Sequence, residues 1–251
     1  MPDKLNLQKI LSEIENEIKQ IPSKGEPASY IPELANVNPE KLGLSLITVD
    51  GQNFGFGHRN EKFSIQSISK VYALTMAYSI KGESLWNRLG VEPSGNPFNS
   101  LIQLELEKGI PRNPFINAGA LVICDILFDV LKNPKAELLD FVKQLTNNQQ
   151  ISYNLKMAES EKQSGFRNAA LINMMKSFGN IYNRISDVLD LYFHLCSIDM
   201  TCTELAQSFM LFCNHGTLQG SSDKIISKSK TKRINSIMQT CGFYDEAGEF
   251  S

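Results

Sequence analysis

The sequence predicts an α/β (α+β) chain in which a small sheet lobe adjoins a larger helical lobe. One observation is a single clear β-hairpin: residues 42–49 read as a strand, Asp50-Gly51 is a hairpin turn signal, and residues 52–58 read as the return strand. The other is the long succession of helical periodicities that follows the hairpin. An isolated hairpin is marginal in water, so we expect further strands or a helix to cover it.

The composition excludes several functional classes. The chain has 251 residues, 42% of them hydrophobic and 21% charged, which suits one large domain or two small lobes around a sizeable core. A formal net charge of -2 gives no reason to expect nucleic acid or an anionic membrane as a partner. No apolar run reaches about 18 residues, so no transmembrane helix is expected, and the N-terminus leads into a helix rather than a signal peptide.

The histidine and cysteine patterns give no reason to expect a metal ion or another cofactor. The three histidines are scattered and no Cys-x-x-Cys pair occurs. The cysteines are odd in number and fall in apolar helices or a turn, so we interpret them as buried free thiols of a cytoplasmic protein. They are Cys124, Cys196, Cys202, Cys213 and Cys241.

Helices account for most of the remaining chain. Residues 7–21 carry one apolar stripe between charged residues, which predicts a surface helix ahead of the hairpin. Residues 118–131 are apolar nearly all round, so that helix should lie buried in the centre of the helical lobe. The other predicted helices cover residues 71–80, 101–107, 138–145, 168–178, 186–197 and 201–214, with a last short one at 234–238.

Local signals set several of these boundaries. Ser186 is a good N-cap for its helix, and Thr201 with Glu204 forms a capping-box pattern. Residues 153–167 are polar and predict mostly irregular structure. Residues 220–232 read as a polar, basic loop, for which a solvated surface is a better interpretation than nucleic-acid binding in a chain of nearly neutral charge.

The segment from Phe63 to Leu74 carries the candidate chemistry. Ser67 would lie at the N-terminus of a helix, and Lys70 one turn later would share its face. A serine hydroxyl becomes a good nucleophile when a base takes its proton, and a lysine can be that base where a dry pocket lowers its pKa. The pattern predicts an acyl-serine hydrolase of the Ser-x-x-Lys kind.

The spacing alone is weak evidence, because such a match is expected about once by chance in a chain of this length. Three more matches begin at Ser221, Ser227 and Ser229, in a polar, lysine-rich stretch. Only Ser67 follows a predicted hairpin and opens a predicted apolar helix, which favours it over the others.

A longer match supports Ser67. Residues 63–71 resemble the nucleophile segment of the serine-dependent glutaminases, which are related in fold to β-lactamases and transpeptidases. Further segments resemble the same family in the same order, and together they run from about Tyr30 to the last residue. These segments are 28–35, 92–100, 111–120, Ser160-Glu161 with Arg167-Asn168, 188–193 and 240–245.

The resemblance implies a glutaminase, an amidohydrolase that converts L-glutamine to L-glutamate and ammonia through an acyl-serine intermediate. It implies Ser67 as nucleophile, with Lys70 and the Tyr244 hydroxyl sharing the proton transfers, and the Ser67 backbone N–H as one oxyanion donor. It also implies a homo-oligomer, a dimer or tetramer. The substrate-binding residues that it implies are Tyr30, Ser67, Asn117, Glu161, Asn168, Tyr192 and Tyr244.

Residue type makes these binding roles chemically sensible. Glu161 can supply negative charge for the α-ammonium of glutamine, and Asn117, Asn168 and Tyr192 offer neutral donors and acceptors. For Tyr30 the residues alone favour a packing role, whereas the resemblance puts its hydroxyl over the substrate.

One region departs from the family pattern. The family continues after the position of Tyr244 into a Lys-Ser-Gly strand, which is not found here. That strand would carry a second oxyanion donor, and the loss of one donor typically costs ~2.7–4 kcal/mol of transition-state stabilisation. The activity of the chain is therefore open. Two alternatives are a catalytically inactive glutamine-binding or regulatory protein, and a penicillin-reactive Ser-x-x-Lys relative.

The expected organisation has two lobes in one functional unit. Residues 1–84 and 221–251 would form the α/β lobe with an incomplete sheet, and residues 85–220 the helical lobe. The site is expected between them, where ligand pockets often form.

Overall fold

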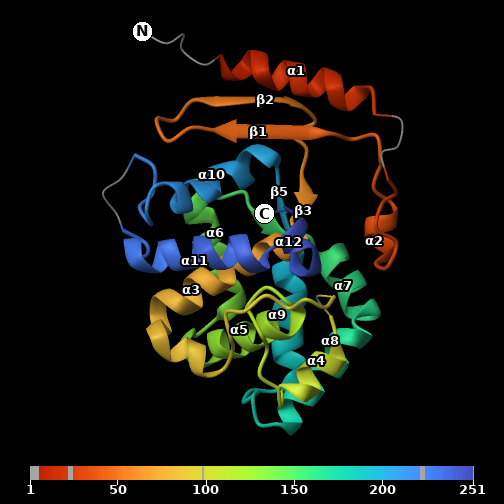
Figure 1. Ribbon diagram of the computed structural model, residues 1–251, viewed down its shortest axis with the longest axis vertical. Helices are drawn as coiled ribbons and strands as arrows, with labels where there is room; N and C mark the ends of the chain where they lie inside the picture. The colour runs from red at the N-terminus through yellow and green to blue at the C-terminus, as the bar shows by residue number, and fades with distance from the viewer. Residues whose placement is uncertain (1–5, 22–24, 98, 221–223, 251) are drawn as a thin grey trace.

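The computed structural model describes residues 6–21, 25–97, 99–220 and 224–250. Figure 1 shows a hairpin with one helix above it at one end of the molecule, and helices filling the rest. The strands are β1 (Gly43–Ile47), β2 (Asn53–Gly57), β3 (Phe63–Ser64), β4 (Ser152–Tyr153) and β5 (Ile198–Met200).

The helices follow one another along nearly the whole chain. They are α1 (Leu7–Lys19), α2 (Pro32–Ala35), α3 (Lys70–Lys81), α4 (Leu101–Leu106), α5 (Asn117–Val130), α6 (Pro134–Thr146), α7 (Leu155–Ser164), α8 (Phe166–Ser177), α9 (Ile185–Cys196), α10 (Cys202–Cys213), α11 (Lys228–Cys241) and α12 (Ala247–Phe250). Three 3-10 turns join them: η1 (Gln66–Ser69), η2 (Gly82–Asn87) and η3 (Tyr244–Glu246).

The predicted hairpin is confirmed, and helices cover it. β1 pairs antiparallel with β2, with Gly43 opposite Gly57 and Ile47 opposite Asn53. The helix α1 contacts β2, and α10 contacts β1 from the other side (Figure 1). This arrangement satisfies the requirement that a two-stranded sheet be covered.

A second sheet was not predicted. β5 lies between β3 and β4 and is antiparallel to both. Strands of two or three residues are too short to show an alternating pattern, so the sequence gives no signal for them. These short strands help to position the Ser67 turn. β3 pairs with β5, and Ile65, directly after β3, donates its N–H to Ile198 O in β5 (2.9 Å).

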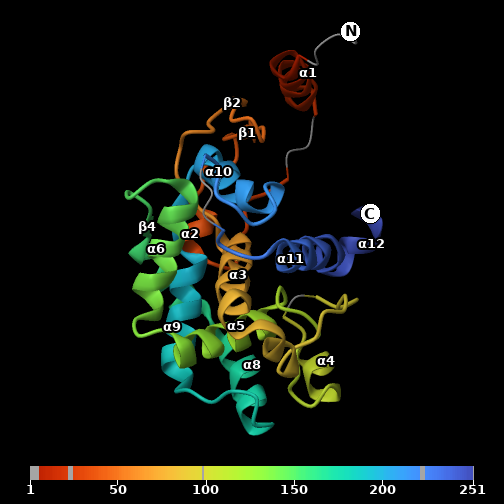
Figure 2. The ribbon, with the colours of Figure 1, turned by 90° about the vertical axis from the view of Figure 1, so that its left-hand side faces the viewer.

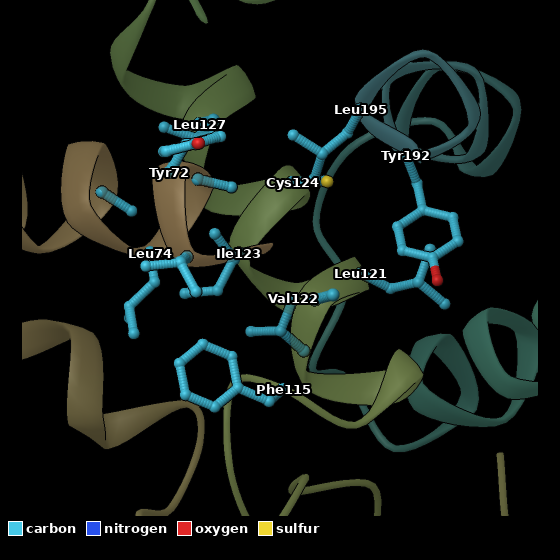
Figure 3. Packing of buried hydrophobic residues seen from close by; sticks show 14 of the residues in the cluster. Tyr72, Leu74, Phe115, Leu121, Val122, Ile123, Cys124, Leu127, Tyr192 and Leu195 are labelled. Atoms are coloured by element: carbon cyan, nitrogen blue, oxygen red, sulfur yellow. The ribbon is translucent and has the colours of Figure 1, made fainter. Parts of the chain in front are cut away.

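The core is centred on α5, as predicted. Its residues from Asn117 to Leu127 are all buried, and it contacts α3, α8 and α9. Figure 3 shows this packing, with Phe115 and Tyr192 on opposite sides of α5. In Figure 2, α3 lies between α9 and α11. The helix α3, which follows Ser67, is therefore packed against other helices on two sides.

Two polar segments predicted as irregular are helical. Residues 155–164 form α7, whose N-cap Asn154 accepts a hydrogen bond from Met157 N (3.1 Å). The helix α11 begins at Lys228, within the predicted basic loop, and its N-cap Ser227 accepts from Lys230 N (3.3 Å). The buried face of α7 contains Ser160 and Glu161 beside Met157 and Ala158, and that of α11 contains Thr231, so neither helix shows a clean apolar periodicity.

The helix boundaries are partly as predicted. The capping box of Thr201 and Glu204 is present at the start of α10. Ser186 is not an N-cap: α9 begins at Ile185, and the Ser186 hydroxyl donates to Asp187 Oδ1 (3.1 Å). The other predicted helices are present with ends shifted by a few residues.

The cysteine prediction is only partly right. All five thiols are free, and Cys124, Cys196 and Cys241 are buried. Cys202 is half-buried and Cys213 is exposed, because Cys213 is the last residue of α10. In the described part of the chain, none of the helices combines the length and apolar character needed to cross a membrane.

Candidate active site

Ser67 lies in a tight turn between β3 and α3. The turn η1 contains Ser67, and α3 begins three residues later at Lys70. Gln66, directly before Ser67, has φ 48°, a left-handed conformation that is uncommon for a residue other than glycine. The buried Ser69 hydroxyl donates to Gln66 O (2.6 Å) and holds this turn in place.

The competing Ser-x-x-Lys matches have ordinary roles or lie outside the structure. Ser227 is the N-cap of α11, and Ser229 lies in its first turn. Ser221 lies outside the described residues.

Lys70 is buried, with 1% of its surface exposed. Its ammonium donates to Phe115 O (2.8 Å) and to Asn117 Oδ1 (2.8 Å). Asn117 Nδ2 in turn donates to Asn168 Oδ1 (2.9 Å). Three of the predicted site residues are thus joined in one hydrogen-bonded chain that begins one turn after Ser67.

Tyr244 lies next to this chain. Lys70 Nζ is 5.5 Å from the centroid of the Tyr244 ring, within the range of a cation–π contact. Ser67 and Tyr244 both line a pocket of about 870 Å³. The structure therefore places Tyr244 beside Lys70 and in the same pocket as Ser67.

The pocket beside Ser67 has mainly apolar walls, and we call it the β1 hollow. β1 forms one side, and α10 and the end of α11 form others. Its lining consists of Gly43, Leu44, Ser45, Ile65, Gln66, Ser67, Ile68, Val71, Phe115, Cys202, Leu205, Ala206, Phe209, Met238, Gly242, Phe243 and Tyr244. Tyr30, Asn117, Glu161, Asn168 and Tyr192 do not line it.

Glu161 is a buried carboxyl in α7. Burial raises its pKa to about 7, although a hydrogen bond from Gln66 and the charge of Lys70 both act to lower it. A carboxylate in such a place gains most from a cationic partner, because burial without one disfavours its charge.

Two tyrosines lie close enough to Glu161 to be affected by its charge. Burial, and after it the Cys196 thiol and Glu161, raise the pKa of Tyr192 well above its ordinary value, so its hydroxyl stays protonated. Desolvation and then Glu161 raise the pKa of Tyr30. Tyr30 is nevertheless 65% exposed as a residue, so the packing role favoured from residue type alone is wrong.

Two contributors to the site were missed. Gln66 lines the β1 hollow, donates to Ser64 Oγ (3.0 Å) and hydrogen-bonds Glu161. Its position directly before Ser67 was the one feature of the sequence that could have indicated a role in the site. The other is the Phe115 carbonyl, which accepts from Lys70. Because it is a backbone group, the residue type at position 115 does not predict this role.

The glutaminase family model matches residues 25–251. A glutaminase from Saccharophagus degradans is 56% identical over 249 residues, covering 99% of this chain and 81% of the relative. A glutaminase from Christiangramia forsetii is 54% identical over 247 residues, covering 98% of this chain and 81% of the relative.

Solved structures agree with these relatives. The structure of ybaS, a probable glutaminase, superposes with a TM-score of 0.89 at 27% identity, covering 98% of this chain and 81% of that one. A probable glutaminase from Bacillus subtilis gives a TM-score of 0.78 at 30% identity, covering 84% of this chain and 68% of that one. The predicted α/β fold of the β-lactamase-like type is confirmed by this likeness, and the chain belongs to the glutaminase family.

Proposed function

We propose that this glutaminase hydrolyses the side-chain amide of L-glutamine through an acyl-serine intermediate, with Ser67 as nucleophile. The observation that carries the proposal is Lys70, a buried amine held by Phe115 O and Asn117 one turn after Ser67 and beside the ring of Tyr244. A dry amine at this distance along a helix is suited to exchange a proton with the serine hydroxyl.

The chemistry balances with these groups. Lys70 takes the proton as Ser67 Oγ bonds to the amide carbon, and the carbonyl electrons move to the oxygen. The oxyanion collapses, the C–N bond breaks, and the Tyr244 hydroxyl delivers a proton to the leaving ammonia. Water then attacks the acyl-serine ester and gives a proton to the Tyr244 phenolate, the ester bond to Ser67 Oγ breaks, and glutamate leaves as Lys70 returns its proton to Ser67.

Glu161 is the proposed partner for the α-ammonium of glutamine. Its burial raises its pKa, so a bound cation would stabilise its charged form. Asn168 and Tyr192 are proposed to bind the remaining polar atoms, and the exposed Tyr30 to cover the bound substrate. Asn117 would serve both the substrate and Lys70.

The test is ammonia release from glutamine by the parent chain and by Ser67→Ala. We expect the variant to lose at least ~10⁴-fold in kcat, since removal of a serine nucleophile costs enzymes of this kind several orders of magnitude. Equal activity in the two proteins would end the assignment.

The two alternatives have their own outcomes. Glutamine binding by calorimetry without any ammonia release would favour an inactive binding protein. Covalent labelling of Ser67 by a fluorescent penicillin, without glutamine hydrolysis, would favour a penicillin-reactive relative.

We further propose a cytoplasmic homo-oligomer, a dimer or tetramer, with the division into lobes at 1–84 with 221–251 and 85–220. Five free thiols support a reducing compartment. Sedimentation at several concentrations tests the oligomeric state.

A further inference from the structure

We propose that Asn113 is a positioning residue for Lys70. Its side chain fixes the loop of residues 113–117, and that loop supplies both acceptors of the Lys70 ammonium. This inference rests on the proposed roles of Ser67 and Lys70.

Asn113 is one of the most deeply buried polar residues, with 1% of its surface exposed. Its Oδ1 accepts from Phe115 N (3.0 Å) and from Ile116 N (3.1 Å), which closes a turn over Pro114. Its Nδ2 donates to Glu92 O (2.9 Å). The amide thus bonds on both of its ends, so its orientation is fixed.

The backbone of Asn113 is held as firmly as its side chain. Glu92 N donates to Arg112 O (2.9 Å) and Gly90 N to Pro111 O (2.8 Å), which braces the chain just before Asn113. On the other side, α5 packs directly on this backbone: a Cβ at Gly119 would lie 1.9 Å from Asn113 O. The turn is therefore anchored to a second segment and to the central helix.

The turn transmits its position to Lys70 through Phe115 and Asn117. Phe115 donates its N–H to the Asn113 side chain and accepts the Lys70 ammonium with its carbonyl. An ammonium has three donors in a tetrahedral arrangement, and the loop binds two of them. The loop thereby sets the third direction, along which the neutral amine presents the lone pair that takes the Ser67 proton and the ammonium presents the N–H that returns it.

The experiment compares Asn113→Leu and Asn113→Asp with a control at Asn180. Leucine keeps the branched shape and loses every hydrogen bond, whereas aspartate keeps both accepted bonds and replaces the donor with a carboxyl oxygen that faces Glu92 O. Asn180 is the control: it is 8% exposed and donates to Arg88 O (2.9 Å) and to Gly109 O (2.8 Å), at the far end of the same α4–α5 connection, with no bond to Lys70, to its acceptors or to the Asn113 turn.

We expect Asn113→Leu to lower kcat about 100-fold, the loss typical of a small displacement in an active site, with a smaller change in KM. Asn113→Asp should restore kcat to within about 5-fold of the parent. Asn180→Leu should lower the melting temperature as Asn113→Leu does, while its kcat per folded molecule stays within about 2-fold of the parent.

The inference is overturned if Asn113→Leu keeps its kcat, if Asn180→Leu loses as much kcat, or if aspartate is no better than leucine at position 113. Should the leucine variant not fold, Asn113→Ser takes its place, because a serine hydroxyl accepts one of the two N–H groups and should give an intermediate kcat. A parental kcat in the serine variant would also overturn the inference. Ser67→Ala distinguishes a failure of the proposed mechanism from a failure of the positioning role. Parental activity in Ser67→Ala refutes the mechanism, whereas an inactive Ser67→Ala together with a normal kcat in Asn113→Leu refutes only the positioning role.

Discussion

At the scale of single residues, the proposed site contains two buried ionisable side chains. Lys70 has its ammonium on two neutral acceptors, and Glu161 has its pKa raised to about 7 by burial. Groups held in this way are costly to bury and are common at functional sites. The cost is offset where a substrate or a proton transfer uses the charge.

The raised pKa of Glu161 predicts a pH-dependent KM. Below about pH 7 the carboxyl is mainly protonated and cannot pair with an ammonium, and above it the carboxylate is present. We therefore expect KM for glutamine to fall as pH rises through about 7 and then to level off. Steady-state kinetics across this range measure it.

Glu161→Gln is the control for that prediction. It should raise KM about 10- to 100-fold, since a hydrogen bond to a charged group contributes roughly 1.5–3 kcal/mol, and should flatten the dependence on pH near 7. A variant that retains the parental pH profile would assign the titration to another group.

At the scale of elements, α10 matters because it covers β1 and forms one wall of the β1 hollow. Its first turn is closed by the capping box, in which Thr201 accepts from Glu204 N (3.1 Å) and Glu204 accepts from Thr201 N (2.7 Å). Glu204 also receives a bond from Asn148 Nδ2, which ties the end of α6 to the same turn.

Thr201→Ala should lower the free energy of unfolding by about 1 kcal/mol, the usual effect of losing an N-cap hydroxyl. Urea denaturation measures the change. Ser236→Ala, on the exposed face of α11, is the control and should shift stability by less than about 0.5 kcal/mol. A loss no larger in Thr201→Ala than in this control would contradict the prediction.

Whether an element could be predicted depended on how long its pattern was. The hairpin and α5 carry extended periodicities and clear turn or apolar signals, so both were found. β3, β4 and β5 are two or three residues long, and their pairing joins segments far apart in sequence. The helix α7 was missed because its buried face includes the polar Ser160 and Glu161, although Asn154 was a usable N-cap signal.

For the site residues, too, prediction depended on the length of the sequence pattern that contains them. Ser67, Lys70 and Tyr244 stand out as side chains in long ordered matches, and the structure places Tyr244 beside Lys70 and in the same pocket as Ser67. The Phe115 carbonyl and the Asn113 turn depend on backbone geometry, which residue type does not encode.

At the scale of the whole molecule, one buried ion pair and its hydrogen bonds join three segments that are far apart in the sequence. Asp125 in α5 accepts from Arg88 Nη2 (2.5 Å), and its side chain also accepts from the backbone N–H groups of Tyr182 (3.2 Å) and Asn183 (2.9 Å). The Asp125 side chain is 0% exposed and that of Arg88 12%. None of these residues lines the β1 hollow, so a change here should report on stability rather than chemistry.

Asp125→Asn should cost about 3–5 kcal/mol of stability, because it leaves the buried Arg88 charge without its partner. In a chain of this size that corresponds to a fall in melting temperature of roughly 6–20 °C. The control is Asp190→Asn, whose pair with Lys135 is 41% exposed on each side and should contribute less than about 1 kcal/mol. Equal shifts in the two variants would show that burial does not decide the effect.

The β1 hollow has a practical consequence for measurements on this protein. An apolar recess of about 870 Å³ in the folded chain is large enough to take up an environment-sensitive dye such as anilinonaphthalene sulfonate. Such dyes usually report partly unfolded states, which expose apolar surface. Here the native protein should already fluoresce with the dye, so a melting curve followed this way begins from a bright baseline, and circular dichroism is the sounder choice for the stability tests above.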